Sequence, residues 1–509
     1  MSPLVIAILG ILFLIWAYKN IFINPKGSPP GLPKLPIFGS YLFFLAVNFN
    51  HMHRAALFWS KFLKSKIFKM WLGNYYCIVV NDSDAIKEVL YNSDFDGRPD
   101  IFLARLRDPN MDRRGIFFTD GPMWKEQRRF ILRHLRDYGF GRRFQELELV
   151  INEEIRDMID IMKNGPKYPH EEEFSKPEGN KFLAPFIFMP FTTNCFLHVM
   201  CNIRFPRSEQ KDLLELAKSS TILQRVGDIY GRMMGVAPWL VHIFPGMTKF
   251  SELRKVSMEM HVFFQKIISH HLDTYDENNE RNFIDLYIKE MRLKGTESSF
   301  SVEQFTLSLV DFAFPAITAI GFQIAMFLQY ALLHPEVIEK MQYEIDNVVG
   351  NGRFPCLDDR QNLHLCEAAV REILRIETLV ATDVPHVAMV DTELKGFRVP
   401  EGTIIFPTLT AFHDDEDIWG DPRNFRPERF LDEQGHLSLK KDFSLPFGAG
   451  KRLCAGETFA RNMLFLIITA LVQQFNFVLE KGEKLPTPER NGCGIVVTAP
   501  DMWITVRNR

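Results

Sequence analysis

Apolar positions recur mainly with helical spacing along this chain, and only a few short stretches show the two-residue period of a strand. The clearest strand pair is predicted over residues 67–72 and 76–80, with Ser83 as a good N-cap for the helix that follows. Helical patterns begin again near Met123 and fill most of the remaining sequence. The pattern therefore predicts a mainly α protein with a small β portion. Residues 97–122 and 165–182 are expected to be loops.

The longest apolar stretch covers residues 301–333 and is hydrophobic on all sides. Such a helix belongs in the centre of a fold or in a membrane, and its length permits either. Asp311 and Pro315 lie inside it and favour a buried core helix.

A second apolar run lies at the N-terminus. Residues 3–18 carry no charge and Lys19 closes the run. As a helix they would span about 24 Å, a little less than a bilayer core. A secretory signal would have a basic start and a small-residue cleavage site, and both are missing. We expect residues 1–20 to be a membrane anchor, with the rest of the chain on the cytosolic side because the flanking lysines follow the run.

Five prolines fall between residues 25 and 36, within an expected hinge over residues 21–40. Proline-rich sequence is stiff and non-helical, so the stretch is either an ordinary linker or a spacer that sets how the globular part sits on the membrane. No Gly/Ser/Pro-rich linker follows in mid-chain. Residues 41–509 are therefore expected to form one domain.

Composition excludes some classes of protein. The net charge of −3 argues against a nucleic-acid binder. Seven scattered cysteines without a C-x-x-C pair fit a reducing compartment and no zinc site.

The strongest chemical signal is a glycine-rich bend over residues 447–456 that carries Cys454 just before a helical pattern. Unsatisfied N–H groups at a helix start favour a thiolate over a thiol. Arg452 can meet an anionic group. A single cysteine is usually only a buried core residue. The flanking pattern F-x-x-G-x-R-x-C-x-G overrides that reading.

This pattern resembles the heme-ligand loop of the cytochrome P450 family, the heme-thiolate monooxygenases. The resemblance implies a cytochrome P450 fold with heme b, whose iron is ligated by Cys454. It also implies that Phe447, Arg452 and Gly456 contact the cofactor. Trp124 and Arg128 share a helix face. The remaining heme-binding residues implied by the resemblance, as partners of the heme carboxylates, are Arg98, Trp124, Arg128 and His386.

Three further residues resemble the structural lock of the family. Glu372 and Arg375 are three apart and can pair on one helix face, which by itself means little. Arg429 follows in the sequence P-E-R-F, and the resemblance implies that it joins the pair in a buried network.

The family signature for oxygen activation falls on residues 315–319 and is altered here. Ala316 keeps the small residue, Thr318 stands where an acid is usual, and Ala319 stands where a threonine is usual. An alanine cannot donate a proton, whereas general acid catalysis needs a donor in reach. Pro315 should also kink the helix. We take Thr318 and Ala316 as the candidate catalytic positions.

Three functions remain open. The first is an NADPH-dependent monooxygenase that inserts one oxygen atom of O2 into an apolar lipid, steroid-like or foreign compound. The second is an isomerase or dehydratase that acts on a peroxide substrate without O2, and the third is a heme-binding sensor without turnover. The resemblance implies NADPH–cytochrome P450 reductase and cytochrome b5 as partners, contact with membrane lipids, no nucleic acid, and the endoplasmic reticulum membrane as the location.

Overall fold

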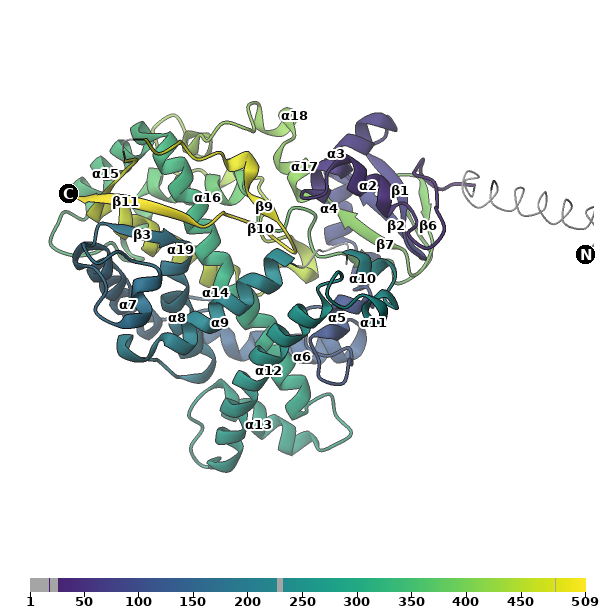
Figure 1. Cartoon of the computed structure of the whole chain (residues 1–509), viewed down its shortest axis with the longest axis horizontal. Coiled ribbons are helices and arrows are strands. Elements are labelled where there is room, and N and C mark those ends of the chain that lie inside the picture. Colours follow the sequence, from purple (N-terminus) through teal and green to yellow (C-terminus); the bar gives the residue numbers. More distant parts are fainter. Residues whose placement is uncertain (1–17, 19–25, 227–231, 481) are drawn as a thin grey trace, which may run out of the picture.

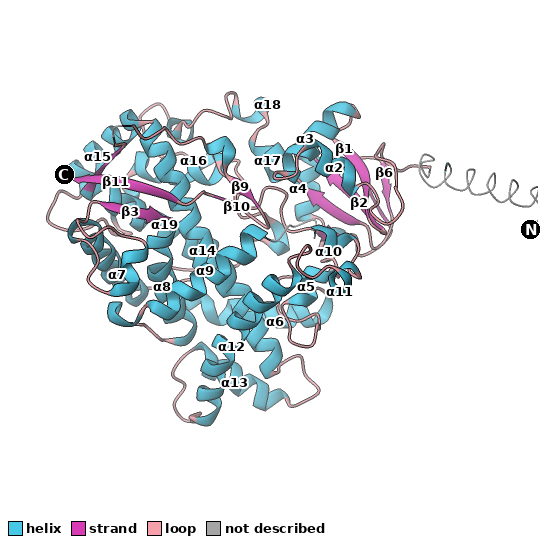
Figure 2. Ribbon diagram, viewed as in Figure 1, coloured by secondary structure: helices cyan, strands magenta, loops and turns pink. Residues whose placement is uncertain are grey.

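The structure of the protein is a computed structural model that describes Tyr18 and residues 26–226, 232–480 and 482–509. The expected anchor over residues 1–20 lies outside the described residues, apart from Tyr18. Figure 2 shows a molecule dominated by helices with a small β portion, as the sequence predicts.

The helices make up the body of the molecule and surround a long central helix, α14 (Figure 1). Their bounds are α2 Tyr41–Val47, α3 Met52–Phe62, α4 Ser83–Tyr91, α5 Phe102–Leu106, α6 Gly121–Leu135, α7 Gln145–Asn164, α8 Met189–Cys201, α9 Lys211–Val226, α10 Arg232–Val236, α11 Leu240–Ile243, α12 Phe250–Asp273, α13 Phe283–Lys294, α14 Val302–Leu333, α15 Pro335–Val348, α16 His364–Ile376, α17 Leu409–His413, α18 Glu416–Trp419 and α19 Glu457–Gln474.

Helix α14 begins where the sequence predicts, because the Ser301 hydroxyl accepts a hydrogen bond from the Gln304 N–H at 3.1 Å. It packs against α8, α9, α12 and α19. Among the described residues it is the one helix long and apolar enough to cross a membrane, but 78% of its most apolar window is buried inside the molecule. The interpretation of residues 301–333 as a core helix is confirmed.

The strands form two sheets and two hairpins. The larger sheet has the order β1-β2-β7-β4, in which β2 and β7 run parallel and the other neighbours antiparallel; the second has the order β3-β11-β8. The strand bounds are β1 Ile67–Leu72, β2 Tyr75–Val80, β3 Lys181–Ala184, β4 His386–Val387, β5 Thr392–Leu394, β6 Phe397–Val399, β7 Ile404–Pro407, β8 Phe475–Val478, β9 Gly492–Cys493, β10 Val497–Thr498 and β11 Met502–Asn508.

The described part of the proline-rich stretch is attached to the larger sheet. The Lys69 N–H donates to the Pro30 carbonyl at 2.9 Å, and the Leu32 N–H donates to the Lys69 carbonyl at 3.1 Å. A Cβ on Gly31 would lie 2.2 Å from the Lys69 side chain, so only glycine permits this approach. These residues lie along the edge of β1 and hold the start of the domain in place.

Three local predictions are wrong in detail. The N-cap of α4 is Asp82, whose carboxylate accepts from the Ala85 N–H at 2.9 Å, and Ser83 is the first helical residue. Residues 97–122 contain the short helix α5. Residues 165–182 include a 3-10 turn in which Glu171 is buried because it forms an ion pair with Arg207. A partner distant in sequence turned each apparent loop into ordered structure.

Candidate active site

The loop that carries Cys454 is held in one conformation by its backbone. The Cys454 N–H donates to the Phe447 carbonyl at 2.9 Å and closes the bend three residues before α19. Gly450 has φ +65°, and a Cβ there would lie 2.1 Å from the Leu90 carbonyl oxygen on α4. Glycine is therefore required at this position. At Gly456 a Cβ would meet only Phe140, at 3.6 Å.

Cys454 is the exposed cysteine of the chain; the other six are buried or half-buried. Surrounding protein atoms still crowd its thiol, and this burial raises the pKa of Cys454 above its ordinary value. The Gly456 N–H and the Arg128 guanidinium act in the opposite direction. The sequence predicts that the helix start favours the thiolate form of Cys454. The Gly456 N–H does lower the pKa, as predicted, but the effect of burial is larger.

A tryptophan and an arginine lie together beside the loop. The Arg452 guanidinium stacks on the Trp124 ring, with 3.6 Å between its carbon and the ring centroid. Arg452 Nε donates to the Asp96 carbonyl at 2.8 Å. Arg128, four residues after Trp124 on α6, donates to the Leu453 carbonyl next to the cysteine. The structure thus brings Trp124, Arg128 and Arg452 together around the cysteine loop.

Arg98 and His386 extend the same cluster. Arg98 Nη1 donates to the carbonyls of Val384 and Pro385 at 3.3 and 3.2 Å. His386 is fully buried, and its Nδ1 lies 2.7 Å from the Phe95 carbonyl, to which it donates. The β4 strand that carries His386 pairs with β7, so the sheet fixes the ring position.

The site contains more positive charge than its own carboxylates compensate. Burial, together with the charges of Arg98 and Arg128, lowers the pKa of Arg452 to about 8, against the attraction of Asp96 and Asp120. Burial also lowers the pKa of Arg98 to about 10, against the attraction of Asp383. Repulsion among buried guanidinium groups is relieved by an anionic partner.

Unpaired polar atoms mark where that partner would lie. Among the described residues, Arg98 Nε, Trp124 Nε1, His386 Nε2 and Arg452 Nη2 are buried without a hydrogen-bond partner. Buried polar groups are normally paired, so several orphan atoms in one place indicate a ligand that satisfies them. A heme with two carboxylates and an iron ligand at Cys454 fits the three N–H donors among these atoms, which belong to Arg98, Trp124 and Arg452.

The predicted role of His386 toward a heme carboxylate depends on the protonation of its ring. Because Nδ1 donates to Phe95, Nε2 of the neutral ring carries no proton and can only accept. Burial and the charge of Arg98 lower the pKa of His386, while Asp383 and Phe95 oppose the shift. Donation to a heme carboxylate from Nε2 therefore requires the protonated ring.

The three lock residues form a buried network. Arg375 Nε and Nη2 donate to the two carboxylate oxygens of Glu372 at 2.8 and 2.9 Å, and Arg429 Nε donates to Glu372 at 3.0 Å. Glu372 and Arg375 are fully buried. Arg375 Nη1 also donates to the His413 carbonyl at 2.9 Å, which joins α16 to the segment ahead of the cysteine loop. These are the contacts that the resemblance implies.

A histidine that the sequence did not single out connects the lock to the cysteine loop. The Leu445 N–H donates to His413 Nε2 at 2.9 Å, so Nδ1 carries the proton and donates to the Thr378 hydroxyl at 2.5 Å. Thr378 in turn donates to the Arg375 carbonyl at 2.8 Å. Burial and the charge of Arg375 lower the pKa of His413 to about 3, which keeps the ring neutral.

Replacing His413 with alanine is expected to lower the free energy of unfolding by about 2–4 kcal/mol, because buried Leu445 and Thr378 groups lose their partners. Chemical denaturation followed by circular dichroism measures the loss. His436→Ala, at a surface turn, is the control and should change stability by less than about 0.5 kcal/mol. Equal effects of the two substitutions would contradict a role for the His413 connection.

The part of α14 that carries the altered signature presents small and apolar groups. Phe314, Pro315, Ala316 and Ala319 are half-buried, whereas most of their neighbours on α14 are fully buried. Helix α14 continues through Pro315, and the Phe314 carbonyl accepts from Ser220, Gln224 and Thr318 at 3.2, 3.0 and 3.1 Å. No acidic or hydroxyl side chain lies among the half-buried residues of this part of α14.

Thr318 has contacts that differ from its predicted role. Its side chain is fully buried; the hydroxyl donates to Phe314 and accepts a hydrogen bond from Gln224 on α9. Ala316 and Ala319 are one turn apart on another face of the helix. The hydroxyl proton of Thr318 is therefore already donated within α14, and its oxygen accepts the contact from α9.

Several charged residues of the site were missed by sequence reasoning. Asp120 accepts from the Arg98 N–H at 2.8 Å and from Arg113 at 2.8 Å, and Asp383 lies 3.6 Å from His386 Nε2. An aspartate in a loop has no distinctive sequence pattern. The one available signal was the density of Arg and Asp between residues 97 and 122.

Fold and site together define a heme-thiolate enzyme with a buried cofactor and an apolar distal face. The family model of cytochrome P450 matches residues 29–506. Human cytochrome P450 2J2 is 32% identical over 93% of this chain and 90% of its own length. Rabbit cytochrome P450 2J1 is 31% identical over 97% of this chain and 94% of its own length. The farnesoate epoxidase of Bombyx mori is 29% identical over 91% of this chain and 90% of its own length.

The chain belongs to the cytochrome P450 family. It is a heme-thiolate monooxygenase that acts on lipophilic compounds. Its cofactor is heme, which receives electrons from NADPH through a reductase.

Proposed function

We propose that this enzyme inserts one oxygen atom of O2 into an apolar small molecule, a lipid, steroid-like or foreign compound, with electrons from NADPH. The observation that carries the proposal is the set of unpaired donors around Trp124 and Arg452, next to the exposed thiol of Cys454. The name of the Bombyx mori relative, an epoxidase of farnesoate, supports a lipid with a long apolar chain as the substrate class.

Bound heme, with a thiolate as ligand, supplies the electron-rich iron that favours cleavage of the O–O bond. Cys454 would ligate the iron, and Arg98, Trp124 and Arg452 would hold the heme carboxylates. Phe314, Pro315 and Ala316 exclude water and leave room for an apolar substrate. Because Ala319 carries no donor and the Thr318 hydroxyl already donates its proton to the Phe314 carbonyl, the proton must come from bound water or from a substrate hydroxyl.

One observation also favours the second function, rearrangement or dehydration of a peroxide substrate without O2. The half-buried residues of α14 between Phe314 and Ala319 offer no proton donor. A peroxide substrate already contains the bond to be broken and needs no proton for oxygen activation. A sensor without turnover is the remaining alternative.

Comparing two reactions separates these functions. With NADPH and reductase, the enzyme should oxidise an apolar substrate; with a lipid hydroperoxide alone, it should give little product. Product only from the hydroperoxide would support rearrangement, and no product from either would support a sensor. Ala319→Thr should raise the yield of product per NADPH by up to about 100-fold, the lower end of what a positioned general acid typically contributes. An unchanged yield would contradict a deficit in proton delivery.

The expected partners and location belong to the same proposal. Lys125, Arg129 and Arg133 are exposed along α6 and would form a basic docking face for NADPH–cytochrome P450 reductase and for cytochrome b5.

Phe58 and Phe62 on α3 and Trp239 before α11 are exposed and would contact lipid. Helices α3 and α11 lie in the same half of the molecule as the larger sheet (Figure 1). We place the enzyme on the cytosolic face of the endoplasmic reticulum membrane.

A further inference from the structure

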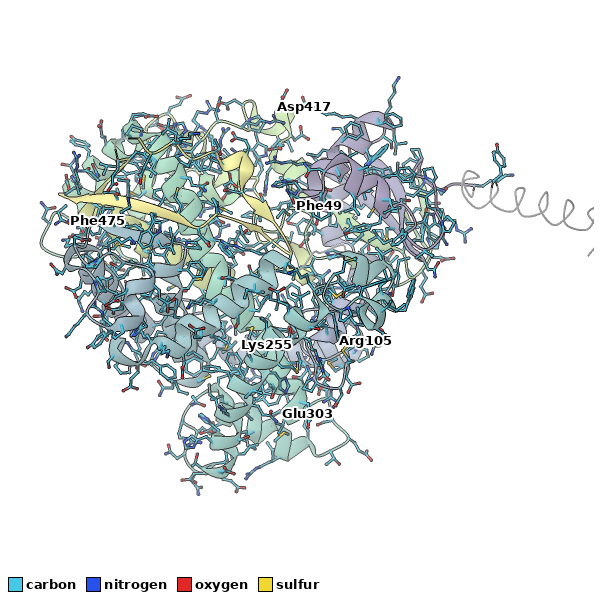
Figure 3. All side chains as sticks on the ribbon, viewed as in Figure 1. Phe49, Arg105, Lys255, Glu303, Asp417 and Phe475 are labelled. Carbon is cyan, nitrogen blue, oxygen red and sulfur yellow. The ribbon has the colours of Figure 1, made fainter. Side chains whose placement is uncertain are left out.

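A small enclosed cavity lies between α5, α9, α12 and α14, beside the residues that precede Ala316. Its volume is about 30 Å³. In Figure 3, Arg105, Lys255 and Glu303 mark α5, α12 and the first turn of α14. Most of its wall is apolar. The apolar lining includes Leu103, Phe118, Leu223, Met260, Val310 and Ile495.

One hydroxyl on this wall has no partner. Ser257, on α12, is 1% exposed, and its Oγ makes no hydrogen bond although it lines the cavity. A buried hydroxyl without a partner is unfavourable, and native structures rarely contain one without a reason. Binding pockets that are mostly apolar obtain orientation from a few polar groups of this kind.

Among the described residues, the two charged groups on the cavity wall compensate each other. Arg107 and Asp311 form an ion pair, and Asp311 also accepts from the N–H groups of Ile116 and Phe117 at 2.7 and 2.9 Å. The Arg107 guanidinium lies 5.0 Å from the centroid of the Phe118 ring. The cavity therefore gains nothing from a charged ligand, and a ligand carboxylate would come close to Asp311.

We infer that Ser257 selects substrates by hydrogen bonding, and that the substrates are neutral apolar molecules that carry a hydroxyl or carbonyl oxygen at one end. This inference rests on the proposed function and names its substrate class. The cavity has room for a group of the size of a water molecule, which suits a terminal oxygen.

The position of the cavity also defines which part of the substrate is oxidised. Phe314 lines the cavity, and Ala316 follows two residues later on α14. Asp311 and Ala316 are about 7.5 Å apart along a helix. A substrate whose oxygen is bound by Ser257 would pass Phe314 and present to the iron a carbon remote from that oxygen.

Equilibrium binding of matched probes to the full-length heme enzyme tests this inference without turnover. The probes are 1-decanol, decane and decanoate, and the readout is the change in the heme absorption spectrum on titration. The wild type should bind 1-decanol about 3- to 10-fold more tightly than decane, which corresponds to one hydrogen bond, and decanoate more weakly than 1-decanol.

Variants at Ser257 decide the assignment. Ser257→Ala should make the affinities for 1-decanol and decane equal, and Ser257→Thr should keep the preference. Ser308→Ala removes a buried hydroxyl of α14 that bonds within its own helix, and it should also keep the preference. Retention of the preference in Ser257→Ala, its absence in the wild type, or tightest binding of decanoate would overturn the inference. Failure of the proposed function would appear differently, as intact binding preferences without oxidation under NADPH and reductase.

Discussion

Replacing Cys454 with alanine is expected to lower NADPH-driven oxidation by more than about 100-fold, because loss of a residue that merely supports a metal ligand already costs 10- to 100-fold. No other cysteine can take over the role, since the remaining six lie elsewhere and are buried or half-buried. Product formation with purified reductase measures the loss, and the retained heme is measured in the same sample.

Cys356→Ala provides the matched control, because Cys356 is half-buried and lies in a loop before α16. Its activity should equal that of the wild type. Cys454→Ala should keep its helical circular dichroism, since the alanine still donates its N–H to Phe447. Wild-type activity in Cys454→Ala would exclude the sulfur as the ligand.

Replacing Arg375 with leucine is expected to lower the free energy of unfolding by about 3–5 kcal/mol, because Glu372 remains as a buried charge with fewer partners. The carbonyl oxygens of His413 and Pro422 lose their donors as well. Urea denaturation followed by circular dichroism measures the change, and heme content after purification should fall with it.

The exposed ion pair of Arg398 and Asp391 is the control for this prediction. Arg398→Leu should change stability by less than about 1 kcal/mol, which is typical of surface pairs. A loss below 1 kcal/mol for Arg375→Leu as well would show that the network contributes little to the fold.

The features that the sequence predicted are those that local spacing determines. The strand pair that begins at Ile67 follows from two short, mostly apolar runs on either side of a turn at Gly73-Asn74, and α14 follows from an apolar run that a serine caps. Glu372 and Arg375 are one helix turn apart, so their contact needed no knowledge of the rest of the fold. The cysteine loop could be recognised for the same reason: its residues are consecutive.

The features that the sequence did not reveal depend on partners far along the chain. The proton on His386 is fixed by the carbonyl of Phe95, and the hydroxyl of Thr318 is engaged by Gln224. His413 joins Thr378 to Leu445, and neither contact leaves a periodic pattern. Each of these side chains has the residue type that sequence reasoning expects in a site, but tertiary contacts decide what its polar atoms can do.

The ligand assignment for Cys454 is tested most directly by the absorption spectrum of the purified, heme-loaded protein after reduction under carbon monoxide. Thiolate ligation predicts the strongly red-shifted Soret band that distinguishes a thiolate-bound heme, and the band should be lost in Cys454→Ala and kept in Cys356→Ala. A wild-type spectrum without the shifted band, or a shifted band that persists in Cys454→Ala, would contradict ligation of the iron by Cys454.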